Sequence, residues 1–285
     1  MRHASTPLAV TYSLLAALSY ATLAFTVKWA EAFLPTTLLI FFRQLFGLMI
    51  LLPIASFKLG SLKELRTKIF PIHMLRAFAS LSSMFCLYFA LRYLPLTDAV
   101  LLTYTRPLFI PIVVYLWFQK KWTKNTWIGL VMGFLGVVLI LRPDSHMFNI
   151  ASLVGLAAGL FGAISFTTIR RLTKSEPPER ITFFYLILSL PLAAVPLATN
   201  WKTPTLFGWG ILVLIAIVAI IYQLFLSRAY RHAKAVQVSS LLYSSVAFAY
   251  FFDVLFGSAT LPLSAFVGIA LIILGSIVTL RTQKH

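Results

Sequence analysis

Long apolar stretches follow one another along the whole chain, separated by short polar segments. Most separators contain a proline, a glycine or a cluster of Lys and Arg, residues that begin or end helices readily. An α-helix needs about 20 consecutive apolar residues to cross the hydrocarbon core of a bilayer. The pattern therefore predicts ten membrane-spanning helices, over residues 8–28, 36–57, 72–92, 97–118, 125–142, 151–170, 181–199, 205–227, 235–256 and 262–281. An even number of spans places both termini on the same side of the membrane.

The composition excludes the main alternatives to a membrane protein. Hydrophobic residues make up 60% of the 285 residues and charged residues only 11%, whereas a soluble domain carries about 25% charged residues. The 25 Phe, 11 Tyr and 6 Trp exclude a disordered chain, which lacks apolar surface of this extent. The sequence thus predicts an all-α membrane protein, with too few residues left over for a separate domain outside the membrane.

The net charge of +17 first suggests an anionic partner such as nucleic acid, but the positions of the 24 Lys and Arg residues indicate otherwise. With the N-terminus in the cytoplasm, 17 of them lie in cytoplasmic segments, and four lie on the opposite side: Lys28, Arg92, Arg142 and Lys202. Cytoplasmic loops of membrane proteins are enriched in this way. We therefore expect both termini in the cytoplasm and a location in the bacterial inner membrane. No nucleic-acid partner is expected, because the basic residues are split among six short segments.

The two halves of the chain are similar to each other. A shift of 139 residues aligns, without a gap, Tyr104 with Tyr243, Gly129 with Gly268, Gly136 with Gly275 and Arg142 with Arg281. We therefore divide the chain into a repeat over residues 1–145 and a second over residues 146–285, each with five predicted helices. Because five is odd, the repeats are inverted relative to each other, an arrangement typical of transporters with alternating access to a midplane site. Gene duplication in a membrane protein of another kind is the alternative.

A resemblance to a known family rests on several segments of both halves. They are residues 91–99, Pro107–Phe109 and the glycine-rich stretch 127–140, repeated less clearly between Ala229 and Gly275. These segments resemble the EamA domain of the drug/metabolite transporter superfamily. Residues 41–43 and 75–77 are similar to the branch that includes bacterial S-adenosylmethionine carriers and related metabolite permeases. The resemblance implies a ten-helix carrier whose central cavity is lined mainly by the first, third, fourth, sixth, eighth and ninth spans.

Two arginines lie deep within predicted spans and are candidate ligands for a substrate. Counted from the outer ends of their helices, Arg43 lies about 11 Å and Arg106 about 13 Å into the membrane. A charge in hydrocarbon is costly, so each is a functional candidate, and a guanidinium can hold a carboxylate or phosphate through two parallel hydrogen bonds. For Arg43 we favour a structural clamp on backbone carbonyls over a ligand. For Arg106, which directly precedes Pro107, we favour contact with the substrate.

Several aromatic and amide side chains complete the candidate substrate site. Tyr104 and Tyr243 are equivalent in the two repeats, and Tyr20, Tyr222 and Gln223 lie on spans that the resemblance places at the cavity. A tyrosine combines an apolar ring with one hydroxyl, which suits it to hold a ring or a cation. Packing between helices is the alternative for each tyrosine.

These features predict a secondary transporter for a small polar metabolite with an anionic or zwitterionic group, such as an amino acid. The alternative is a membrane protein that moves or senses a lipid or another amphiphile, and a structural membrane subunit is a weaker option. The expected partners are a small-molecule substrate and membrane lipids. The sequence leaves open whether the protein is a monomer or a homodimer, and whether it imports or exports its substrate.

The sequence contains no motif that indicates an enzyme, a metal site or a cofactor. The single cysteine, Cys86, excludes an internal disulfide. Carriers driven by protons usually place an Asp, Glu or His near the midplane, and the carboxylates Glu176 and Glu179 fall in a predicted loop instead. We therefore favour exchange or facilitated movement over proton coupling.

Overall fold

Helices are the only regular secondary structure in the part of the chain that the structure describes. The computed structural model describes residues 6–59, 66–94, 96–119, 122–142, 150–199, 201–256 and 263–281. Its helices are α1 (Thr6–Ala30), α2 (Thr36–Leu59), α3 (Phe70–Tyr93), α4 (Leu96–Thr103), α5 (Arg106–Phe118), α6 (Lys124–Leu141), α7 (Ile150–Leu172), α8 (Pro178–Thr199), α9 (Leu206–His232), α10 (Ala235–Leu242), α11 (Ser244–Leu255) and α12 (Leu263–Arg281). Ten segments of these described ranges are long and apolar enough to cross a membrane, which confirms the predicted number of spans.

Two predicted spans, 97–118 and 235–256, are broken near their middle, and the prediction of continuous helices was wrong there. The first is divided into α4 and α5 at Tyr104 and Thr105, and the second into α10 and α11 at Tyr243. A shift of 139 residues carries α4 onto α10 residue for residue and Tyr104 onto Tyr243. Pro107 is the second residue of α5, where the missing N–H leaves no hydrogen bond unmade. The two breaks thus fall at equivalent positions of the two halves.

Local hydroxyl groups explain why the chain leaves the helix at these positions. Thr and Ser side chains can bond nearby carbonyls and so offer the backbone an alternative to the regular helical ladder. Four such bonds flank the breaks: Thr103 Oγ1 to Val100 O (2.7 Å), Thr105 Oγ1 to Leu102 O, Ser244 Oγ to Leu241 O and Ser245 Oγ to Leu242 O (2.6 Å each). These bonds partly satisfy the carbonyls beside the two breaks.

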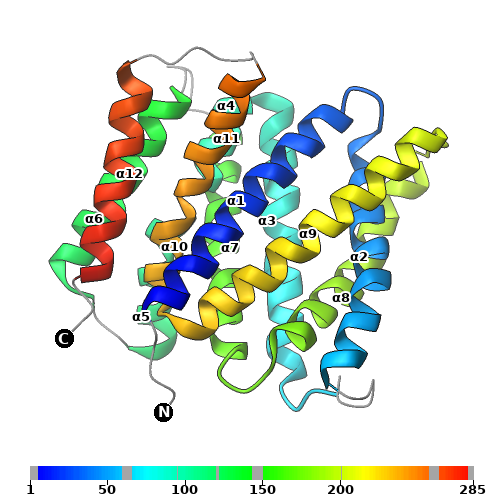
Figure 1. Ribbon diagram of the computed structural model, residues 1–285, viewed down its shortest axis with the longest axis horizontal. Coiled ribbons are helices and arrows are strands. Elements are labelled where there is room, and N and C mark those ends of the chain that lie inside the picture. The colour runs from blue at the N-terminus through cyan, green and yellow to red at the C-terminus, as the bar shows by residue number, and fades with distance from the viewer. Residues whose placement is uncertain are drawn as a thin grey trace.

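The helices pack in pairs that correspond between the two halves. Helix α3 packs along α7 and α1 packs along α9, while α5 lies against α7 and α11 lies against α1. The predicted inverted repeat requires this correspondence, because it exchanges the first span with the sixth, the third with the eighth and the fourth with the ninth. Helices α6 and α12 form one edge of the bundle, and α2 and α8 form the other (Figure 1).

A glycine seam joins α6 and α12 at close range. A Cβ on Gly129 would lie 2.6 Å from the carbonyl oxygen of Gly275, and a Cβ on Gly268 would lie 2.7 Å from that of Gly136. The 139-residue shift converts the first contact into the second, which is the pattern that a twofold axis between the two helices would produce. The glycines therefore act as a packing seam, as expected for small residues between membrane helices.

A buried contact between two polar side chains links α3 to the segment between α7 and α8, on the side of the bundle where α1 begins and α12 ends. His73 Nε2 lies 2.6 Å from Glu176 Oε2, and the two side chains are 0% and 3% exposed. Thr67 donates a hydrogen bond to the other carboxylate oxygen, and Arg180 lies 3.8 Å from it. Glu179, also buried, contacts Lys58 and Arg228 at 3.2 and 3.4 Å. Glu176 lies between helices, as the sequence predicted, but the predicted loop position of Glu179 was wrong, because it lies in the first turn of α8. The sequence did not reveal that both glutamates are buried and paired.

We predict that Gly129→Ala lowers the apparent melting temperature of the purified protein. The added methyl group meets backbone atoms of α12, which cannot move aside as a side chain can, and overpacking of this kind costs about 1–3 kcal/mol. Gly210→Ala is the matched control, because nothing lies within 4 Å of its Cβ position. That control should be neutral or stabilising, since alanine favours a helix over glycine. Equal melting temperatures for the two variants would contradict the close seam.

We also predict a specific loss of stability in acid through Glu176. Burial raises the pKa of its carboxyl, but hydrogen bonds from His73 and Thr67 and the charges of His73 and Arg180 outweigh burial and lower the pKa below its ordinary value. Because the folded pKa is below the unfolded one, the carboxylate stabilises the fold above the unfolded value. This contribution is lost as the pH falls through the folded pKa.

The apparent melting temperature of the wild type should therefore fall more steeply below about pH 4.5 than that of Glu176→Gln. Thermal unfolding over a pH series measures both slopes. Glu31→Gln removes an exposed carboxylate and should keep the wild-type slope. If Glu176→Gln kept that slope too, the carboxylate would not stabilise the fold through its charge.

Candidate functional site

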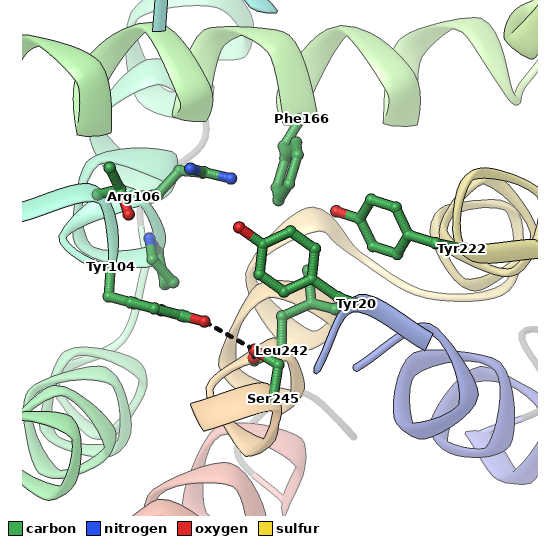
Figure 2. Close-up of a pocket in the computed structure, with 9 residues that line it drawn as sticks. Tyr20, Tyr104, Arg106, Phe166, Tyr222, Leu242 and Ser245 are labelled. Carbon is green, nitrogen blue, oxygen red and sulfur yellow. Dashed lines mark hydrogen bonds between the residues drawn. The ribbon is translucent and has the colours of Figure 1, made fainter. Parts of the chain in front are cut away.

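The two helix breaks meet at a cavity inside the bundle with about 410 Å³ of empty volume. Its walls come from α1, from both sides of the first break, from α7 and α9, and from both sides of the second break (Figure 2). The lining residues are Tyr20, Thr103, Tyr104, Arg106, Pro107, Phe166, Tyr222, Leu242 and Ser245. Five of the six spans that the family resemblance implied contribute to this lining, and the third span does not.

Arg106 brings a positive charge to this cavity. It is the first residue of α5, so the break itself sets the direction of its side chain. A Cβ on Gly162 of α7 would overlap the Arg106 side chain, which shows that the glycine provides the space in which the arginine lies. The guanidinium carbon lies 4.9 Å from the centre of the Phe166 ring, within the range of a cation–π contact.

The guanidinium of Arg106 keeps hydrogen-bonding capacity for a ligand. Its Nε is buried and has no hydrogen-bond partner among the described residues. A buried donor without an acceptor is costly, and a charged one more so. An anionic group in the cavity would satisfy it, and a planar carboxylate or phosphate matches the fork of donors on a guanidinium.

Three tyrosines surround the space beside the guanidinium. The rings of Tyr20 and Tyr222 lie 5.2 Å apart, and in Figure 2 both hydroxyls point into this space. The Tyr104 hydroxyl lies 3.2 Å from Ser245 Oγ, so this bond connects the first break to the second. None of the described lining residues is acidic. The site therefore combines one cation, several hydroxyls and apolar ring faces, and it suits a solute with both an anionic and an apolar part.

The structure thus brings together four of the predicted site residues and leaves three outside the cavity lining. Tyr20, Tyr104, Arg106 and Tyr222 line the cavity. Tyr243 is fully buried with its ring against α6, since a Cβ on Gly133 would lie 2.7 Å from its Cδ2. Arg43 and Gln223 lie elsewhere, with α2, α3, α8 and α9.

A second arginine cluster, next to the cavity, contains these two residues and corrects one expectation. Arg76, in the second turn of α3, was not among the candidates from the sequence, yet its side chain is 1% exposed. It donates to the Ile181 carbonyl at 2.7 Å and to Gln223 Oε1 at 3.1 Å, and lies 5.0 Å from the Tyr185 ring centre. Arg43 is half-buried and interacts electrostatically with the same tyrosine. Arg76 therefore makes the carbonyl clamp that we expected of Arg43.

Two cavity residues, Ser245 and Phe166, were not among the predicted site residues, although the sequence contains a signal for each. Ser245 is equivalent to Arg106 under the 139-residue shift, so the repeat that relates Tyr104 to Tyr243 could also have indicated it. Phe166 lies one helical turn after Gly162, the last of three glycines spaced along one face of α7. Among the described residues, no group of three or more His, Cys, Asp or Glu could hold a metal ion.

Ten apolar spans around a central polar cavity define an integral membrane protein of the solute transporter class. The chain belongs to the EamA-like transporter family, whose model matches residues 7–142 and 149–281. This match confirms the family resemblance noted in the sequence.

Related proteins of known function are transporters of different small metabolites. The chain is 27% identical to the pseudopaline exporter CntI of Pseudomonas aeruginosa, over 96% of each chain. It is 28% identical to a riboflavin transporter of Vibrio cholerae, over 71% of this chain and 68% of the relative. It is 27% identical to an S-adenosylmethionine uptake transporter of Rickettsia bellii, over 60% of this chain and 58% of the relative. These similarities identify the chain as a small-metabolite transporter. The relatives are named for different metabolites.

A solved structure supports the fold. One crystal structure superposes with a TM-score of 0.85 over 99% of this chain and all of the other, at 20% sequence identity. At this identity the match bears on the fold alone.

We predict that Gly162→Ala destabilises the protein only when Arg106 is present. All three of the nearest atoms to a Cβ at this position belong to the Arg106 side chain. In the wild type the substitution should cost about 1 kcal/mol or more, and in an Arg106→Ala background it should be neutral or stabilising. Melting temperatures of the four proteins in this cycle measure the coupling. An equal effect in both backgrounds would show that Arg106 does not lie over Gly162.

Proposed function

We propose that the protein is a secondary transporter of the bacterial inner membrane for a small polar metabolite with an anionic or zwitterionic group, such as an amino acid or an amino-acid-like compound. The observation that carries this proposal is the Arg106 guanidinium, whose buried Nε has no partner among the described residues and which lines the central cavity. A cation in this position selects for a negative group and orients it.

The remaining lining supports a solute larger than a simple ion. The rings of Tyr20, Tyr222 and Phe166 offer apolar faces. The hydroxyl oxygens of Tyr104 and Ser245 offer acceptors, because their protons are donated to Ser245 and to the Leu242 carbonyl. Ring faces combined with a few convergent polar groups are typical of sites that bind small molecules. Pseudopaline, riboflavin and S-adenosylmethionine, which the relatives are named for, are therefore reasonable test compounds beside amino acids.

Alternating access would come from movement between the halves 1–145 and 146–285. We place the side where α1 begins and α12 ends in the cytoplasm, because Lys58, Arg171, Lys174, Arg228 and Arg231 lie on this side. The central cavity is lined by residues of a single chain. Its described lining holds no carboxylate to relay protons, which favours exchange or facilitated movement.

The alternative of a protein that moves or senses an amphiphile receives less support. That function predicts Arg43 and Arg106 together at a lateral opening between helices. Arg106 lines the central cavity instead, and Arg43 lies outside its lining.

The test starts with a thermal-shift screen of amino acids, riboflavin, S-adenosylmethionine and pseudopaline on the purified protein, followed by counterflow of each hit in liposomes. We predict that Arg106→Gln weakens binding and transport of an anionic hit about 10- to 100-fold, the value of one charge-assisted hydrogen-bond pair. Binding and transport by Arg106→Lys should fall between those of the wild type and Arg106→Gln, because lysine keeps the charge and loses the two parallel donors of the guanidinium.

Arg231→Gln, which removes an exposed charge outside the cavity, is the matched control and should transport normally. Melting temperatures and chromatography establish that each variant is folded. Normal counterflow of an anionic solute by folded Arg106→Gln would refute the assignment of Arg106. Movement of lipid analogues without counterflow of any polar solute would favour the amphiphile function.

A further inference from the structure

A second cavity, with about 660 Å³ of empty volume, lies between α5, α7 and α10 on the side where α1 begins and α12 ends. It shares no lining residue with the central cavity. Four of its nine described lining residues are basic and none is acidic; the basic ones are Arg170, Arg171, Lys174 and Lys234. Basic side chains clustered in one concave site create a positive potential, which attracts an anion.

A buried hydroxyl in this basic cavity points to a ligand independently of the charges. Thr167 is 1% exposed, and its Oγ1 has no hydrogen-bond partner among the described residues. Almost all buried polar groups in folded proteins are paired, so an orphaned one indicates a missing partner. Because Thr167 lines the cavity, an anion bound there could accept this hydrogen bond.

Two further features prepare the cavity for an anion. Arg170 Nη1 donates to the carbonyls of Tyr230 (2.6 Å) and Arg231 (3.2 Å), which holds its guanidinium in place. Lys234 and Ala235 lie at the N-terminus of α10, where the helix dipole favours negative charge and Gln237 Oε1 caps the Lys234 N–H at 3.2 Å. The cations and the helix terminus thus belong to one site.

The cavity also has an apolar wall. Phe118 and Trp122 line it, and the Lys174 ammonium lies 5.4 Å from the centre of the Phe118 ring. A bare inorganic ion would leave this wall uncovered, whereas an organic anion would contact it.

We propose that this basic cavity is a second binding site, which takes the carboxylate or phosphate group of an organic anion on this side of the membrane. Two sources can supply such a group, a dissolved metabolite and the headgroup of an anionic lipid. The site is distinct from the central cavity and does not depend on Arg106.

Phenyl phosphate is a suitable probe, because it joins a phosphate to an aromatic ring. We expect saturable binding to the full-length protein in phosphatidylcholine nanodiscs, measured by calorimetry, and no binding of the neutral analogue benzyl alcohol. The double variant Arg171→Gln/Lys174→Gln should weaken the affinity at least tenfold, and Thr167→Val should weaken it several-fold. Arg171 and Lys174 are exposed at the protein surface, so the fold should tolerate their replacement in the double variant.

Two controls test whether the loss of affinity is specific to the basic cavity. Lys68→Gln/Arg231→Gln removes the same charges from exposed positions outside the cavity and should bind as the wild type does. Arg106→Gln should also leave the affinity unchanged. Equal affinity in the two double variants, or a loss confined to Arg106→Gln, would overturn the proposal, and neither result would affect the transport assay of the central site.

Native mass spectrometry with phosphatidylglycerol separates the two sources. Weaker retention of this lipid by Arg171→Gln/Lys174→Gln than by Lys68→Gln/Arg231→Gln identifies the headgroup as a ligand of the site. Equal lipid retention, together with weaker phenyl phosphate binding, identifies a dissolved anion. Equal retention together with equal phenyl phosphate affinity would again refute the site.

Discussion

The hydrocarbon core of a membrane offers no hydrogen-bond partners, so each backbone group in it must be satisfied by the protein itself. This constraint makes the two helix breaks the central feature of the structure. Hydroxyls of Thr105 and Ser245 bond carbonyls beside the breaks, and glycines on α7 let the first break approach closely: a Cβ on Gly159 would lie 2.9 Å from the carbonyl oxygen of Leu102. The central cavity lies where the breaks meet, and residues on both sides of each break line it.

The two halves supply different chemistry at equivalent positions. Arg106 follows the first break and Ser245 follows the second, 139 residues later, and both line the cavity. Opposite Arg106 lies Gly162, which leaves the space that the arginine side chain occupies. A symmetric framework thus carries one cation on one side of the cavity. This asymmetry gives a site that can orient a solute with one anionic end.

The apolar pattern predicted the number of spans, because length and hydropathy alone decide which segments can cross a membrane. It also indicated Arg106, because charges are rare in such segments. The internal repeat indicated Tyr104, and the family resemblance indicated Tyr20 and Tyr222. The sequence did not predict the helix breaks, because a hydropathy pattern contains no information on local hydroxyl–carbonyl hydrogen bonds. Arg76 and the His73–Glu176 pair were not predicted for another reason: their partners lie about 100 residues away or more along the chain, so only the folded structure brings them together.

Alternating access requires that the cavity between the two breaks is reached from each side of the membrane in turn. Site-directed labelling tests this most directly, with Ser245→Cys in a Cys86→Ser background and a membrane-impermeant thiol reagent applied to vesicles of both orientations. We predict labelling from both sides, slowed on each side by a transported solute. Labelling from one side only, whatever solute is present, would contradict alternating access to this cavity.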